Sequence, residues 1–119
     1  MRYRVFVEIQ YFIALWQYRL PEMAGFDETR IDDLNAIFEQ FNFADAEQIK
    51  AMERTTNHDV KAVEYFLKTR FDALELHALR EFVHFGLTSQ DINNTAIPLL
   101  FKNALEEVYY PLLQRVSDQ

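Results

Sequence analysis

The 119-residue sequence predicts an all-α fold, a single compact domain of about six helices over residues 1–119. It contains only 2 Gly and 3 Pro, too few for the many tight turns of an all-β sandwich or barrel. Hydrophobic residues make up 50% of the chain, and they recur at the three- and four-residue spacing of a helix face. A chain of this length buries roughly two-thirds of its unfolded surface, which is enough for one core.

Three helices are expected in the first half of the chain. The first covers residues 3–16, and Pro21 and Gly25 break the chain after it. The second opens at Asp27 and ends near Asn42, and the third is a short, mostly charged helix over residues 44–56. Their apolar faces consist of Val5, Ile9, Phe12, Ile13 and Trp16; of Ile31, Leu34, Ile37, Phe38 and Phe41; and of Ile49 and Met52.

The second half predicts three further helices. The fourth starts near Asp59, and its apolar face consists of Val60, Val63, Leu67, Phe71 and Leu74. The fifth covers about residues 76–85 and ends at Gly86, a residue suited to a left-handed stop. The last runs from about Ser89 toward Val116 and contains Pro98 and Pro111. Because proline removes a helix hydrogen bond, we expect a kink or break near Pro98.

Composition excludes several classes of function. A formal net charge of −7 disfavours nucleic-acid binding, which requires clustered Lys and Arg. The absence of cysteine excludes disulfides and thiolate metal sites, and suits a reducing compartment. No apolar run approaches the ~20 residues that cross a bilayer. We therefore expect a cytoplasmic protein with no nucleic-acid or membrane partner.

Two stretches, TTNHDVKAVEYFL and HFGLTSQDINNTA, place a Thr three residues before an Asp at a predicted helix start. Thr56 with Asp59, and Thr88 with Asp91, match the spacing of a capping box. The simplest interpretation is therefore two capped helices, each stabilised by ~1 kcal/mol.

The residues inside these two helix starts also suggest an anion site. Asn57, His58 and Ser89 add hydrogen-bonding groups next to the open backbone amides of a helix start, where the helix dipole favours negative charge. If the two helix starts meet, they would hold a phosphate or carboxylate mainly through neutral hydrogen bonds.

The longer runs ERTTNHDVKAVEYFL and EFVHFGLTSQDINNTA resemble the amino-terminal part of the adenylosuccinate lyases, in the fumarase/aspartase superfamily. The resemblance extends over essentially the whole chain. In the related lyases that cleave argininosuccinate, the second run typically reads HTGRSRND, whereas HFGLTSQD is similar to the purine enzymes.

This resemblance implies an activity and a set of binding residues. The family cleaves adenylosuccinate to AMP and fumarate, and the succinylaminoimidazole carboxamide ribotide to its aminoimidazole counterpart and fumarate, by anti β-elimination. Asn57, His58, Asp59, Thr88 and Ser89 fall at positions that contact this purine ribotide substrate. The resemblance implies no cofactor and no metal, and it implies a homotetramer whose active sites are shared among subunits.

The family's general acid, in a THGQP-like segment, and its base, on a serine-containing loop, have no counterpart in this sequence. We therefore expect an amino-terminal domain without the central helical bundle, with no catalytic residue of its own. Such a fragment is expected to be inactive alone and to self-associate or to be marginally stable, because apolar surface normally covered by the bundle is exposed.

Other interpretations stay open. Glu81 and His84 form a Glu-x-x-His pair of the kind found in di-iron bundles, although the sequence has one copy only. His77 is expected at the surface or in packing, and His84 either caps a helix end or reaches the substrate pocket. Aromatic residues make up 15% of the chain, which also fits a non-enzymatic α-helical interaction module.

Overall fold

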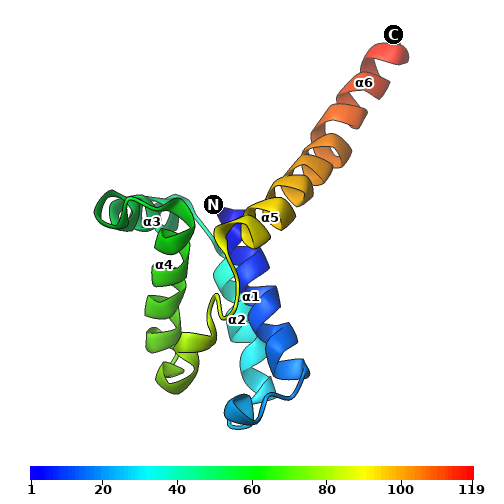
Figure 1. The fold of residues 1–119 in the computed structure, drawn as a ribbon. Coiled ribbons are helices and arrows are strands. Elements are labelled where there is room, and N and C mark those ends of the chain that lie inside the picture. Colours follow the sequence, from blue (N-terminus) through cyan, green and yellow to red (C-terminus); the bar gives the residue numbers. More distant parts are fainter.

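The computed structural model describes residues 1–119 and confirms the all-α prediction, with six α-helices and no strand (Figure 1). The helices are α1 (Arg2–Gln17), α2 (Ile31–Glu39), α3 (Phe43–Thr56), α4 (Asp59–Ala73), α5 (Ser89–Ala104) and α6 (Tyr110–Ser117). Three short 3₁₀ segments connect them, Pro21–Met23, Glu28–Arg30 and His77–Phe82, and a π-helical segment, Leu105–Tyr109, joins α5 to α6.

Helix α1 lies at the centre of the fold, in contact with α2, α4 and α5, while α3 packs on α4. Four residues of the predicted apolar face of α1, Val5, Ile9, Phe12 and Ile13, are buried, and Trp16 is partly buried. Phe12 is fully buried, and its ring makes edge-to-face contacts with Phe26 (5.5 Å between centroids) and Phe71 (4.8 Å). Such contacts add to the large apolar area that a phenylalanine removes from water. The core therefore fixes how α1 sits against α4.

The predicted fifth helix is not an α-helix. Residues His77–Phe82 form 3₁₀ turns between two left-handed residues, Glu75 (φ 59°) and His84 (φ 62°). These conformations interrupt the α-helical path on both sides and leave room for only a short, tighter helix. Gly86 is left-handed (φ 71°), as predicted.

The expected break near Pro98 is absent, because α5 continues through this residue to Ala104. The irregular turn lies further on, where the Tyr110 N–H donates to the Leu105 carbonyl five residues back. This π-helical turn directly precedes Pro111, which has no N–H to donate. The second proline, rather than the first, therefore marks the change in the last helix.

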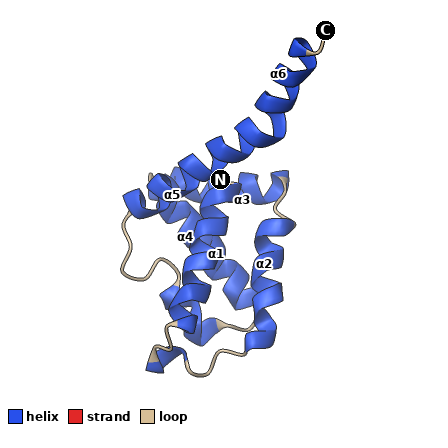
Figure 2. Cartoon of the chain, turned by 90° about the vertical axis from the view of Figure 1, so that its right-hand side faces the viewer, coloured by secondary structure: helices blue, strands red, loops and turns tan.

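The end of the chain projects from the packed body. The second half of α5 and all of α6 extend away from the other helices in both views (Figures 1 and 2). The radius of gyration is 16.5 Å, against about 13.5 Å for a compact domain of this length. None of the helices combines the length and the apolar character needed to cross a membrane.

Candidate functional site

The start of α4 differs from the predicted capping box. Helix α3 continues through Thr56, and Asn57 then adopts a left-handed conformation (φ 51°). His58 is the N-cap of α4, since its ring Nδ1 accepts a hydrogen bond from the Lys61 N–H at 3.2 Å. The predicted pairing of Thr56 with Asp59 is therefore wrong, because the turn at Asn57 moves the cap two residues along the chain.

The start of α5 agrees with the predicted pairing of Thr88 and Asp91. The Asp91 carboxylate accepts hydrogen bonds from the Thr88 backbone N–H (2.7 Å) and hydroxyl (2.9 Å). The backbone hydrogen bond, followed by the hydroxyl one, lowers the pKa of Asp91 below its ordinary value. Asp91 is therefore ionised at neutral pH and its charge is directed to the helix start.

The two helix starts meet through His58 and Ser89. The His58 Nε2 lies 3.2 Å from the Ser89 Oγ, although the residues are 31 positions apart. Because Nδ1 of this ring already accepts from Lys61, a neutral imidazole carries its proton on Nε2 and donates it to Ser89. The Ser89 hydroxyl then retains its own proton, which is free to donate to a ligand.

Asp59 faces α1 rather than α5. Its carboxylate pairs with the Arg4 guanidinium at 2.8 Å and accepts from the Val60 N–H at 2.9 Å. Partial burial acts to raise the pKa of Asp59, but the Val60 hydrogen bond and the Arg4 charge outweigh it, so the pKa is lowered. The carboxylate is ionised, and Arg4 offsets its charge beside the helix start.

We name the five predicted site residues, Asn57, His58, Asp59, Thr88 and Ser89, the entrance cradle. Within it, His58 and Ser89 are in contact and Thr88 precedes Ser89, while the Asn57 side chain makes no hydrogen bond to either α5 residue. The backbone N–H groups of Ser89 and Gln90 have no acceptor in the chain, as is usual in the first turn of a helix. These amides and the Ser89 hydroxyl together can donate to an anion.

The cradle is an open surface feature. His58 has half of its side chain exposed (50%), and none of the four principal hollows is lined by a cradle residue. A hollow of about 470 Å³ between α1 and α5 is lined by Leu87 and Asp91, which are close to the cradle residues in the sequence. Its lining is mostly apolar. The cradle residues therefore lie on an open surface and do not line any of these hollows.

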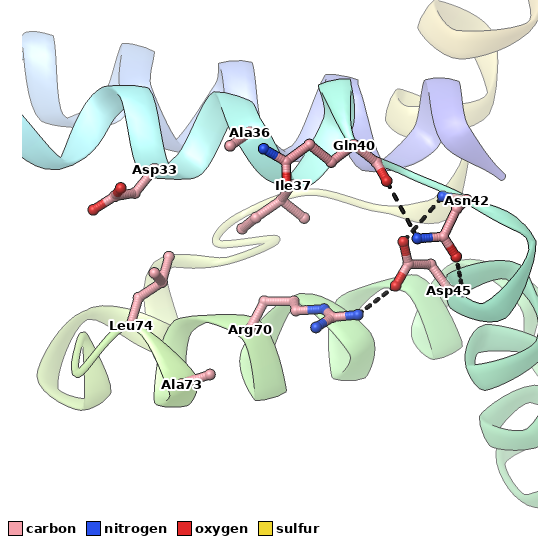
Figure 3. A pocket seen from close by; sticks show the side chains of 9 residues that line it. All are labelled: Asp33, Ala36, Ile37, Gln40, Asn42, Asp45, Arg70, Ala73 and Leu74. Atoms are coloured by element: carbon pink, nitrogen blue, oxygen red, sulfur yellow. Dashed lines mark hydrogen bonds and ion pairs between the residues drawn. The ribbon is translucent and has the colours of Figure 1, made fainter.

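A more polar hollow, of about 440 Å³, lies between α2 and α4 beside the start of α3 (Figure 3). Arg70 lines it, but its guanidinium pairs with Asp45. Asp45 in turn accepts from the Asn42 backbone N–H at 3.0 Å, which completes the capping box of α3. Asp33, which also lines the hollow, pairs with Arg30 at 2.9 Å. Every charged side chain that lines this hollow therefore has a partner within the chain.

The histidines outside the cradle have separate partners. His77 is exposed, as expected, and its Nδ1 lies 2.8 Å from the Asp72 carboxylate. His84 caps no α-helix, and its Nδ1 lies 2.6 Å from Glu8. Glu81 instead pairs with Lys68 at 2.7 Å, and no group of three His, Asp or Glu side chains is placed to hold a metal. The Glu81 and His84 pair therefore does not form half of a di-iron site.

Two α1 residues beside the site, Arg4 and Glu8, were not among the predicted site residues. The Glu8 side chain is fully buried, and burial raises the pKa of Glu8 although the hydrogen bond with His84 opposes this effect. The position of Glu8 between Val5 and Phe12 could have indicated its role, because a charged residue within the apolar face of a helix requires a buried partner.

Comparison with known proteins gives the family. Residues 19–119 match the family described as Lyase. The chain is similar to adenylosuccinate lyases from Vibrio cholerae (48% identical over 120 residues), Dictyostelium discoideum (48% over 122 residues) and Escherichia coli K12 (44% over 120 residues). These matches cover 97–99% of this chain, which spans 26% of the length of each of these relatives. The chain therefore belongs to the lyase family, among the homologues of adenylosuccinate lyase.

Proposed function

We propose that this chain is the amino-terminal, substrate-binding part of an adenylosuccinate lyase that acts in the cytoplasm. Its entrance cradle then binds the purine ribotide that is cleaved to AMP or the aminoimidazole ribotide, with release of fumarate. The observation that supports this proposal best is the contact between His58 and Ser89, because it joins two helix starts into one set of donors.

The cradle suits an anionic group of the substrate. The Ser89 hydroxyl and the first amides of α5 donate without carrying a charge, and the helix dipole adds a partial positive potential. Phosphate and carboxylate oxygens accept such hydrogen bonds at helix starts. Thr88 is committed to Asp91, so in this proposal it positions the α5 start while Ser89 makes the direct contact.

The proposed role is binding, not proton transfer. His58 uses Nδ1 to cap α4 and Nε2 to contact Ser89, which leaves neither ring nitrogen free to act as a general acid or base. Because losing a positioned acid or base slows a reaction by 10²–10⁴-fold each, the chain alone is proposed to lack lyase activity.

Titration of the ¹⁵N-labelled chain with AMP tests the binding role. We expect saturable shifts of the Ser89 and Gln90 amide signals, and their loss in Ser89→Ala. Thr69→Ala is the control, since this hydroxyl donates to the Phe66 carbonyl on α4, away from the cradle. Absence of any saturable shift at α5, or identical shifts in Ser89→Ala, would refute the proposal.

We also propose that the projecting end of the chain binds further copies of the same protein, in a homotetramer. Large apolar side chains there are 49–70% exposed: Ile97, Leu100, Phe101, Val108, Tyr109, Tyr110, Leu112, Leu113 and Val116. So many exposed apolar side chains on one segment are typical of interfaces. The same surface supports the alternative of a non-enzymatic interaction module, which predicts binding to a partner helix and no response to AMP.

A further inference from the structure

The segment that leads into α5 is held to α1 at two points. The first is the buried Glu8, whose Oε1 lies 2.6 Å from the His84 Nδ1. The second is Tyr11, whose hydroxyl donates to the Phe85 carbonyl at 2.9 Å. Between these contacts and the cradle lie only Gly86 and Leu87, followed by Thr88. A displacement at His84 is therefore passed to Thr88 within four residues.

The His84 backbone needs such support. His84 is left-handed (φ 62°), a conformation that a non-glycine residue keeps only when its surroundings over-determine it. Its side chain is 16% exposed, and its ring contacts a carboxylate with no exposed surface. The hydrogen bond to Glu8 is the only side-chain hydrogen bond of His84, so it helps to hold this strained residue in place.

The chemistry of Glu8 also selects one form of the His84 ring. A carboxylate only accepts hydrogen bonds, so in its contact with Glu8 the His84 Nδ1 is the donor and carries the proton. The other ring nitrogen, Nε2, makes no hydrogen bond within the chain. The second Glu8 oxygen, Oε2, is buried and also has no partner, so the carboxylate is committed to His84 alone.

We propose that Glu8 is a positioning residue of the entrance cradle: through His84 it fixes the path of residues 83–87, and so places Thr88 and Ser89 against His58. Arg4, Glu8 and Tyr11 lie at four- and three-residue intervals, on one face of α1. Arg4 holds the α4 start through Asp59, and Glu8 and Tyr11 hold the segment before α5. One helix face thus sets the distance between both halves of the cradle.

This inference rests on the proposed function for its ligand, so the experiment includes one measurement that needs no ligand. The ¹⁵N shifts of histidine rings separate a protonated from a bare nitrogen, and both His84 and His58 report directly. In Glu8→Gln, the amide pairs with either form of the ring, so the His84 Nδ1 signal should move toward the bare form. The His58 Nε2 signal should move as well, because its bond to Ser89 loosens.

The affinity for AMP is the second measurement. We expect Glu8→Gln to lower the affinity for AMP about tenfold, the effect of losing about one hydrogen bond of the cradle. Glu8→Asp should have an intermediate effect. Asp45→Asn is the matched control, since Asp45 is also a buried carboxylate but pairs with Arg70 and accepts from the Asn42 N–H at the start of α3. It should leave both histidine spectra and AMP affinity unchanged.

The possible outcomes are distinct. If the wild-type chain binds no AMP, the proposed function fails, and the histidine shifts alone decide the role of Glu8. If Glu8→Gln does not fold, Glu8→Asp replaces it in both measurements. The inference is overturned if the folded Glu8 variants leave the His58 and His84 signals as in the wild type, or if Asp45→Asn moves them equally.

Discussion

Two substitutions of His58 separate its capping role from its role in the cradle. His58 makes two hydrogen bonds, one from the Lys61 N–H to Nδ1 and one from Nε2 to the Ser89 Oγ. Alanine removes both bonds. Asparagine is among the best N-cap residues, so it retains the first bond, but its side chain is too short to reach Ser89.

The expected loss of stability in each variant follows from which of the two His58 hydrogen bonds it removes. Loss of a cap costs about 1 kcal/mol, and loss of a hydrogen bond costs about 0.5 kcal/mol at an exposed position, the lower end of its range. With a urea dependence of about 2 kcal/mol/M, the unfolding midpoint should fall by ~0.8 M in His58→Ala and by ~0.3 M in His58→Asn. Both variants should bind AMP more weakly.

Urea unfolding followed by far-ultraviolet circular dichroism measures the midpoints, and titration with AMP measures binding. His77→Ala is the control, because His77 contacts only the exposed Asp72 carboxylate. If His58→Asn lowers the midpoint as much as His58→Ala, the ring does not act as the cap. If His58→Asn binds AMP as well as the wild type, the contact with Ser89 does not organise the cradle.

Three further predictions concern the core, the pH dependence and the projecting end. Phe12→Ala should lower the free energy of unfolding by about 4 kcal/mol, because a fully buried ring is lost; a loss below about 1 kcal/mol in urea unfolding would contradict the packing described. Asp91→Asn should flatten the acid dependence of stability: the folded-state pKa of Asp91 is lowered from 3.8, so its contribution is present above about pH 4 and disappears as pH falls through the folded value. Urea midpoints between pH 6 and pH 2 test this, and an unchanged slope would disprove it. Paired substitution of Leu100 and Phe101 by Glu should abolish self-association in sedimentation velocity, since both side chains are exposed on the projecting end; a wild-type chain that remains monomeric at every concentration would refute the association itself.

The fold class and the buried faces could be predicted from the sequence because helical periodicity is local. Val5, Ile9 and Phe12 are spaced as one helix face, and all three are buried. The 3₁₀ segment His77–Phe82 could not be foreseen in this way. Its residues have an acceptable α-helical pattern. Glu75 is left-handed in a local turn in which the Leu76 N–H donates to the Phe71 carbonyl at 2.8 Å, whereas the left-handed His84 contacts Glu8, 76 positions away.

The candidate site shows the same division. The pairing of Thr88 with Asp91 depends on three-residue spacing and was predictable. The cap of α4 was not, because Thr56 and His58 are both suitable acceptors and the choice depends on where α3 ends. The contact between His58 and Ser89, and the burial of Glu8 against His84, arise from tertiary packing across 31 and 76 positions, which spacing alone does not encode.

Both halves of the cradle are attached to one face of α1, through Arg4 and Glu8, so the spacing of these two residues along the helix determines how far apart the halves lie. The 15-residue connection between α4 and α5 is constrained at His84, which contacts Glu8, at the core residues Leu79 and Val83, and at Thr88. A single residue inserted into α1 between Arg4 and Glu8 would rotate one of these side chains by about 100° around the helix axis relative to the other. The two halves of the cradle would then separate, although every cradle residue would be unchanged. In this architecture, a change of helix register in α1 disrupts the cradle without replacing any residue that is proposed to contact the ligand.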